Sequence, residues 1–196
     1  MPMRNIHTHY VKLIFTLMLA VVVGACGESS PPLSSDELKL SQRIKEANSG
    51  DANAQYNLGS MYYSGKDVPK DYSKAFQWFE KAAAQGDAFA QGKLGVMYAK
   101  GEGVPKNAAK AVEWFQKAAA QGNADAQFNL GFTYYYGVDV PEDAAKASEW
   151  LQKAAAQGSA RAQAQLGFMY EEGKGVPKDA VKAVEWYQKA AAGGDD

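Results

Sequence analysis

The chain has 196 residues, of which 46% are hydrophobic and 22% charged, and its formal net charge at pH 7 is −1. These fractions are typical of a folded chain and exclude an intrinsically disordered one. Nucleic-acid binding depends on clustered Lys and Arg residues that neutralise phosphates, and a balanced charge does not indicate such a cluster. We therefore expect no nucleic-acid partner.

The first 25 residues have the pattern of a secretory signal. Arg4 and Lys12 flank an apolar run from Leu13 to Val23. A basic start, an apolar run of about 7–15 residues and small residues after it describe a signal peptide, whereas a membrane-spanning helix needs about 20 apolar residues. We predict a signal peptide over residues 1–25.

The small residues that end this segment carry a resemblance. Val23-Gly24-Ala25-Cys26 resembles the bacterial lipobox, whose cysteine becomes the lipidated first residue of the mature protein. The resemblance implies a lipid anchor on Cys26 and a cell-envelope lipoprotein that faces the periplasm. An aspartate after the cysteine resembles an inner-membrane retention signal, and Gly27 at that position favours the outer membrane. The alternative is an ordinary signal peptide with an incidental cysteine.

Histidine and cysteine usage limits the chemistry of the mature chain. Both histidines, His7 and His9, lie in the predicted signal peptide, and Cys26 is the only cysteine. Ser-His-Asp and Cys-His nucleophile systems and histidine-ligated metal sites are therefore excluded from the expected mature protein. We expect no catalytic residue, no metal and no cofactor.

The segment that begins at the cysteine is predicted to form a polar linker and then a helix. Residues 26–35 include a Ser/Pro-rich stretch without apolar surface, which predicts a flexible linker. Asp36 then opens a short amphipathic helix. Ala47 in this helix lies 36 residues before Ala83, which is the phase of a second repeat helix. We predict that residues 36–49 form an N-terminal half-repeat that caps the first full unit.

The rest of the chain is a tandem repeat. The segment from Val112 to Gly122 returns with small changes, and each copy lies 36 residues from the next. A fixed period of about 20–50 residues means one supersecondary unit stacked on copies of itself. We divide this region into four full units and a short tail: 50–85, 86–121, 122–157, 158–193 and 194–196.

The second unit has the pattern of a helix pair. Ala88 to Tyr98 predicts the first helix, and Gly101 predicts its left-handed C-cap. Asn107 predicts the N-cap of a second helix that runs to about Gln121. The sister units carry Asp71, Asp143 and Asp179 at this N-cap position. In three units a Glu lies four residues before a Lys, which predicts exposed ion pairs: Glu113–Lys117, Glu149–Lys153 and Glu185–Lys189.

Positions that barely change between units predict the core. In the first helix of the second unit these fall in one arc of the helix: Ala88, Ala90, Gln91, Leu94, Gly95 and Tyr98. The four tryptophans occupy one position of the second helix: Trp78, Trp114, Trp150 and Trp186. A tryptophan ladder can stack on carbohydrate, but its repeat register favours packing between helices.

These positions carry a family resemblance over residues 50–193. Leu94-Gly95-x-x-Tyr98 and its three sister copies match the Leu-Gly-x-x-Tyr core of tetratricopeptide repeats. The 36-residue length, the Gly-x-Gly-Val-Pro turn and the Lys-Ala-x-x-Trp-x-x-Lys-Ala-Ala segment resemble the Sel1-like branch, although Asp67 and Asp139 replace one turn glycine. The resemblance implies an all-α, right-handed α-solenoid of helix-turn-helix units whose concave face recognises proteins. It implies no catalytic residue.

First-helix positions opposite the core vary between units and predict a contact surface. Such positions are candidates for an interface when they are rich in large apolar groups. We predict a concave groove with an apolar floor of Phe89, Val96, Phe132, Tyr136 and Phe168 and polar contacts from Lys93, Lys100, Asn129 and Arg161. The alternative is that some of these side chains pack against the neighbouring first helix.

The last unit has no further unit after it in this sequence. Because solenoids usually need capped ends, self-association through this end is one expectation. Tolerated exposure of the last helix is the other.

Three functions are compatible with these patterns. The favoured hypothesis is a non-enzymatic scaffold or adaptor of the bacterial cell envelope that binds a partner protein or peptide in the groove. The second is an envelope structural or regulatory protein associated with the cell wall. The third is a β-lactam or cell-wall hydrolase, which is disfavoured because the relatives linked with β-lactam hydrolysis resemble cysteine-rich units. This sequence also contains no Ser-x-x-Lys and no Lys-Thr-Gly motif.

Overall fold

The computed structural model of the chain describes residues 34–138 and 140–193. The chain divides into two compact units, Met1–Ser35 and Asp36–Asp196, and the repeats lie in the second. The predicted signal peptide, the predicted lipidation of Cys26, most of the linker, Asp139 and the tail lie outside the described residues.

The described residues form nine α-helices and no strand, in agreement with the all-α prediction. The first of these, α2, spans Ser35–Asn48. Eight helices of 13 residues follow and alternate between the first and second helix of each unit. The first helices are α3 (Ala52–Ser64), α5 (Ala88–Lys100), α7 (Ala124–Tyr136) and α9 (Ala160–Glu172). The second helices are α4 (Tyr72–Ala84), α6 (Ala108–Ala120), α8 (Ala144–Ala156) and α10 (Ala180–Ala192).

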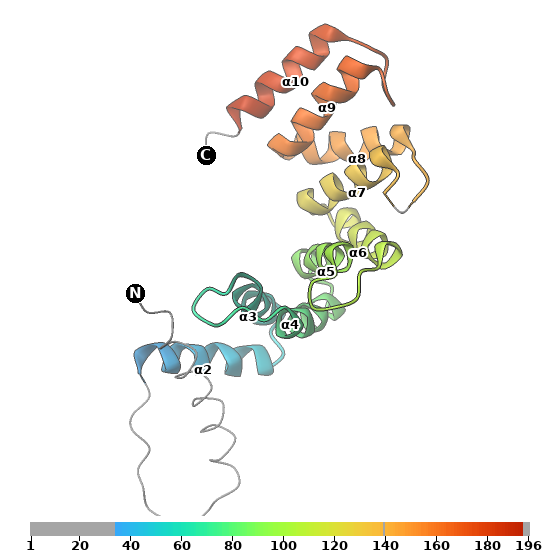
Figure 1. Ribbon diagram of the computed structural model, residues 1–196. Helices are drawn as coiled ribbons and strands as arrows, with labels where there is room; N and C mark the ends of the chain where they lie inside the picture. Colours follow the sequence, from blue (N-terminus) through green and yellow to red (C-terminus); the bar gives the residue numbers. More distant parts are fainter. Residues whose placement is uncertain (1–33, 139, 194–196) are drawn as a thin grey trace, which may run out of the picture. The chain divides into compact units, whose positions relative to one another are not determined.

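The helices stack in chain order (Figure 1). Each first helix packs against the second helix of its own unit, and this second helix packs against the first helix of the next unit. At the N-terminal end of the stack, Ala47 of α2 lies in a buried cluster with Leu58, Met61 and Val68 of the first unit. The predicted solenoid of four helix pairs is confirmed.

Polar side chains and glycines set the ends of the helices. The Oδ1 atom of Asn107 accepts a hydrogen bond from the backbone N–H of Lys110 at 3.0 Å, which makes it the N-cap of α6. The sister residues Asp71, Asp143 and Asp179 cap α4, α8 and α10 in the same way, as predicted. Gly101 ends α5 with φ at 75°, the left-handed conformation that glycine adopts without steric strain.

The glycine of each Leu-Gly pair is the point where the two helices of a unit cross. A Cβ atom on Gly95 would lie 2.5 Å from the ring of Phe115, and one on Gly131 would lie 2.7 Å from Cγ of Leu151. Carbon atoms in van der Waals contact lie about 3.5–4.0 Å apart. The two helices of a unit therefore approach this closely only because these positions carry no side chain.

A ladder of buried glutamines joins successive units through hydrogen bonds. Gln91 Nε2 donates to the carbonyl of Ala83 in the preceding unit, and Gln91 Oε1 accepts from Nε2 of Gln121 at 2.8 Å. Gln55 and Gln127 make the same two bonds in the first and third units. The fourth unit has Gly193 in place of the second glutamine, and Gln163 Oε1 is buried without a partner.

The four tryptophans are half-buried against the preceding layer and are covered by lysines. Trp114 packs against the cluster that contains Phe79 and Leu94, which confirms a packing role. Lys117 Nζ lies over the Trp114 ring, 4.4 Å from its centroid, and the sister lysines lie 3.9–4.2 Å from theirs.

The predicted Glu–Lys ion pairs are wrong: none of the three forms in the described part of the chain. Each lysine instead contacts the aromatic face three residues before it.

Candidate interaction surface

A hollow of about 420 Å³ lies on the first-helix face of the stack, between α5 and α7. Volumes of about 300–1,000 Å³ are typical of pockets that bind small ligands. Its apolar lining comes from Tyr56, Phe89, Val96, Ala99, Phe115, Ala126, Phe132 and Val138. Its polar lining comes from Lys93, Lys100, Asn123, Asp125, Asn129, Thr133 and Arg161, and Gly92 completes it.

The hollow exists because α5 carries two small residues where the flanking first helices carry aromatic rings. Gly92 occupies the position of Tyr56 in the first unit and Phe128 in the third. Ala99 occupies the position of Tyr63 in the first unit and Tyr135 in the third. Positions 92 and 99 lie two helical turns apart and so share one face of α5.

The second small residue also changes how neighbouring layers are connected. In the first unit, Tyr63 at the end of α3 donates a hydrogen bond from its hydroxyl to Glu102, which lies in the turn of the next unit 39 residues later. Between the third and fourth units, Lys174 of the fourth unit makes a corresponding connection by donating to the backbone carbonyl of Tyr135 at 3.2 Å. Between these two layers the corresponding pair is Ala99 and Val138, and both line the hollow. The polar connection is therefore replaced by an apolar wall.

The structure brings most of the predicted groove residues together. Seven of the nine line the hollow: Phe89, Lys93, Val96, Lys100, Asn129, Phe132 and Arg161. The other two, Tyr136 and Phe168, lie outside it. The Tyr136 ring packs on Phe132 at a centroid distance of 4.4 Å, and the Phe168 ring contacts Tyr135 at 6.2 Å. Whether this surface binds a partner stays a prediction.

Some of the predicted groove residues pack against the neighbouring first helix, which is the alternative to a contact role. Phe89 of α5 contacts Tyr56 of α3 with ring centroids 5.9 Å apart, yet 62% of Phe89 remains exposed. Phe168 of α9 contacts Tyr135 of α7 in the same manner. These rings are therefore anchored on one side and open on the other, which is the arrangement of a contact residue held in place by its neighbour.

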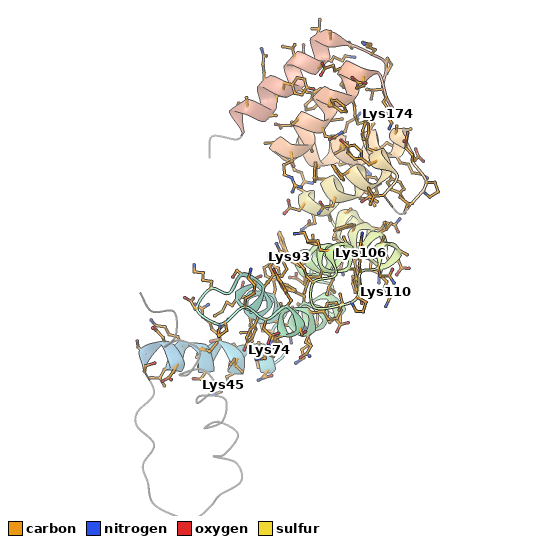
Figure 2. All side chains as sticks on the ribbon, in the orientation of Figure 1. Lys45, Lys74, Lys93, Lys106, Lys110 and Lys174 are labelled. Atoms are coloured by element: carbon orange, nitrogen blue, oxygen red, sulfur yellow. The ribbon has the colours of Figure 1, made fainter. Side chains whose placement is uncertain are left out.

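The charges of the lining are unequal in sign. Among the lining residues that the structure describes, Lys93, Lys100 and Arg161 are cationic and Asp125 is the only carboxylate. Lys100 Nζ lies 3.9 Å from Glu102 Oε1, whereas Arg161 stacks on the Phe128 ring with its guanidinium carbon 4.1 Å from the centroid. Figure 2 shows Lys93 projecting from α5, apart from Lys106 and Lys110.

Sequence reasoning missed the small residues that open the hollow. Gly92 and Ala99 line the hollow without having been predicted as groove residues. The same is true of Tyr56, Phe115, Asn123, Asp125, Ala126, Thr133 and Val138. The signal was present in the comparison of units: a glycine stands at position 92 in a column that otherwise contains Tyr56, Phe128 and Ala164. A glycine where the two neighbouring copies carry aromatic rings indicates a space that those neighbours fill.

The last second helix exposes apolar residues. Val184 of α10 is 54% exposed, whereas Val112 at the same position of α6 is 8% exposed. Val181 is 70% exposed. In the second unit this face is covered by α7, and self-association through the α10 face stays a prediction.

Residues 34–138 and 140–193 contain neither a membrane-spanning helix nor a cluster of metal ligands. No helix there is long and apolar enough to cross a membrane. No group of three or more His, Cys, Asp or Glu side chains there has the arrangement of a metal site.

Comparison with known proteins agrees with this architecture. The Sel1 repeat model matches residues 52–87, 88–123, 124–159 and 160–195, so each repeat begins two residues later than in our division. A protective antigen present in uropathogenic Escherichia coli strains, which displays an SLR fold, has a TM-score of 0.76 and 45% identity over 80% of this chain and 33% of the antigen. A Sel1 repeat protein from Oxalobacter formigenes has a TM-score of 0.76 and 38% identity over 82% of this chain and 66% of its own.

A curated relative matches over a single repeat length. The putative sel1-like repeat-containing protein L18 of Acanthamoeba polyphaga mimivirus is 51% identical over 37 residues, which is 19% of this chain and 6% of that protein. The chain thus spans only a small part of this relative and a third of the Escherichia coli antigen. Sel1 repeat proteins are generally non-enzymatic scaffolds for protein interaction. Because four contiguous matches cover most of its length, the chain belongs to the Sel1 repeat family.

Proposed function

We propose that this protein is a non-enzymatic scaffold of the bacterial cell envelope that binds a segment of a partner protein in the hollow between α5 and α7. The observation that carries the proposal is the hollow itself, which opens where Gly92 and Ala99 replace aromatic residues of the flanking units. A repeat array that served only as a spacer would have no use for a difference of this kind in one unit.

The lining suits a protein segment better than a small polar metabolite. Phe89 and Phe132 are large, exposed and anchored by neighbouring rings, which are features of residues that dominate binding energy at interfaces. Polar groups on Lys93, Asn129 and Arg161 surround this apolar area. An apolar centre with a polar rim is the usual composition of a protein–protein contact.

Filling the hollow tests this function. The variant Gly92→Tyr places on α5 the side chain that α3 carries at the same position as Tyr56, and a Cβ atom at Gly92 has 3.5 Å to its nearest neighbour, Asn123 Oδ1. The Cβ atom is therefore accommodated, and the variant is designed so that its ring occupies the hollow. We expect a partner captured from envelope extract by the full-length chain to be lost with Gly92→Tyr.

The matched control is Asn53→Tyr, which adds the same ring to the first-helix face at an exposed position of α3 outside the hollow. Equal capture of the same partner by the wild-type chain and both variants, all folded by circular dichroism, would exclude the hollow as the binding site.

The envelope location forms a separate part of the proposal and rests on Cys26 and the residues before it. A diacylated cysteine would hold the folded repeats at the membrane, since two acyl chains give stable anchoring where one does not. Such tethering raises the local concentration of the scaffold, so a partner of modest affinity is retained. Labelling of cells with radioactive palmitate is expected to mark the wild-type chain and not Cys26→Ser. Unlabelled wild-type protein in the soluble fraction would refute the anchor.

A further inference from the structure

We propose that the segment bound in the hollow is acidic: an apolar side chain of the partner enters between α5 and α7, and neighbouring carboxylates bind Lys93 and Arg161. This inference rests on the proposed function and names the chemistry of the partner that the hollow accepts.

The first support is that these two cations have no carboxylate partner in the described part of the chain. Neither Lys93 nor Arg161 lies within 4.0 Å of an Asp or Glu oxygen. Lys93 Nζ lies 5.9 Å from the centroid of the Tyr63 ring, and Arg161 contacts the ring of Phe128. By contrast, Lys100 pairs with Glu102 and Lys174 pairs with Glu142. Lys93 and Arg161 are therefore free to bind carboxylates of a ligand, whereas Lys100, which also lines the hollow, is already paired.

The second support is the geometry of Arg161. Its guanidinium carbon lies 4.1 Å from the centroid of the Phe128 ring, so the flat group is supported on its face by an aromatic residue of α7. A guanidinium supported in this way keeps its N–H edge for a ligand, and that edge matches the two oxygens of a carboxylate. Asn129 of α7 also lines the hollow. Thr133 Oγ1 donates a hydrogen bond to the backbone carbonyl of Asn129, which leaves the side-chain amide of Asn129 available to a ligand.

The third support is the contrast between the hollow and the rest of the chain. The whole chain has a formal net charge of −1, whereas the lining residues that the structure describes include three cations and one carboxylate, that of Asp125. The hollow therefore attracts an acidic segment although the chain as a whole carries a small net negative charge. The apolar floor formed by Val96, Ala99 and Phe132 favours a segment that also carries an apolar side chain over a simple anion.

The experiment is a selection of randomised peptides of about twelve residues, displayed on phage, against the full-length chain. Peptides that also bind Gly92→Tyr are removed, so that those remaining require the hollow. We expect the enriched peptides to combine a Phe, Leu or Trp with two or more Asp or Glu residues. Enrichment of neutral or basic peptides would overturn the acidic inference and leave the proposed function in place. Absence of peptides that distinguish wild type from Gly92→Tyr would overturn both.

The two cations are then tested with a fluorescein-labelled copy of the most enriched peptide. Fluorescence anisotropy is expected to show that Lys93→Gln combined with Arg161→Gln weakens binding about ten-fold or more. The matched control is Lys106→Gln combined with Lys110→Gln, which removes the same charge at two positions outside the hollow and is expected to change the affinity less than about two-fold. Equal weakening by both double variants would mean a non-specific charge effect and would refute the assignment of these two residues.

Discussion

The hydroxyl of Tyr63 donates a hydrogen bond of 2.6 Å to Glu102 Oε2, and this bond joins the end of α3 to the turn that follows α5. The donor and the acceptor belong to successive units, 39 residues apart. Burial raises the pKa of Tyr63 above its ordinary value of 10.0, and the bond to the Glu102 carboxylate raises it further. The contact therefore makes the stability of the interface between the first two units depend on the protonation of a tyrosine.

Tyr63→Phe is expected to lower the free energy of unfolding at pH 7 by about 1–2 kcal/mol, because a hydrogen bond to a charged acceptor is lost. In the wild type, the folded pKa lies above the unfolded one. Stability from this group is therefore complete below pH 10 and declines as the pH rises above 10 and the unfolded tyrosine ionises. Urea unfolding at pH 7 and between pH 9 and 11, within about one unit of the tyrosine pKa, measures both effects.

The control is Tyr98→Phe, since the Tyr98 hydroxyl makes no hydrogen bond within residues 34–138 and 140–193. A Tyr63→Phe variant whose stability falls above pH 10 as steeply as that of Tyr98→Phe would show that the bond to Glu102 has no part in the pH dependence.

Gly193→Gln is expected to complete the glutamine ladder and stabilise the last unit. Gly193 has φ −91° and ψ −3°, close to the −90° and 8° of Gln157, so a side chain fits the backbone already present. The new amide would donate to Gln163 Oε1, which is buried without a donor. We expect about 0.5–1.5 kcal/mol from this bond, measured as the difference in unfolding free energy between Gly193→Gln and Gly193→Ala.

Gly193→Ala is needed as the reference because loss of glycine alone stabilises a helical position by about 0.4–1 kcal/mol. If the alanine and glutamine variants have the same stability, the Gln163 oxygen is already satisfied by another group such as water.

Two alanine substitutions in α5 are expected to have opposite effects. Gly95→Ala forces a methyl group to within 2.5 Å of the Phe115 ring, and overpacking of this kind lowers stability by about 1–3 kcal/mol. Gly92→Ala, one turn earlier, meets nothing closer than 3.5 Å and should raise stability by about 0.5–1 kcal/mol through the better helix propensity of alanine. Thermal unfolding of both variants by circular dichroism gives the comparison. A stable Gly95→Ala would mean that α5 and α6 separate at little cost.

Lys117 and Glu113 are expected to contribute unequally to the free energy of unfolding, although both lie on the exposed face of α6. Lys117→Gln removes the cation from the Trp114 ring and should cost about 0.5–1 kcal/mol, whereas Glu113→Gln removes no pair and should have almost no effect. The unfolding free energies of the two variants are measured in urea, because guanidinium chloride is a salt and would screen the interactions being compared. Non-additive losses in the double variant, of the size of an ion pair, would restore the Glu–Lys interpretation.

Much of the fold could be predicted from the sequence because the same helix caps and the same core positions recur in all four units. An N-cap such as Asn107 acts within one helical turn, and the Gly101 C-cap acts within one residue. Local rules of this kind need no knowledge of distant parts of the chain. The repeat period then places each helix pair against the next, which leaves little freedom in the order of packing.

The features that were not predicted depend on contacts between residues far apart in the sequence or on a choice between two nearby partners. Lys117 has Glu113 and Trp114 within reach on the same helix face, and only the orientation of its side chain decides between them. Tyr136 lies outside the hollow and packs on Phe132 and Tyr135 of its own helix. Spacing along the helix indicates that Phe132 and Tyr136 are neighbours, but it does not show where the hollow ends. The hollow itself depends on volume missing from α5 relative to its neighbours.

The small residues at positions 92 and 99 have a consequence for how such proteins diversify. Neither takes part in the crossing at Gly95 and Phe115, nor in the bonds of Gln91, so the scaffold is independent of them. A tandem array can therefore acquire a cavity in any one of its copies when smaller residues replace the two side chains at these positions. The same two substitutions in another copy would place the cavity there instead. New recognition surfaces then arise from deletion of atoms in a duplicated unit, without a new loop, a new helix or any change in the path of the backbone.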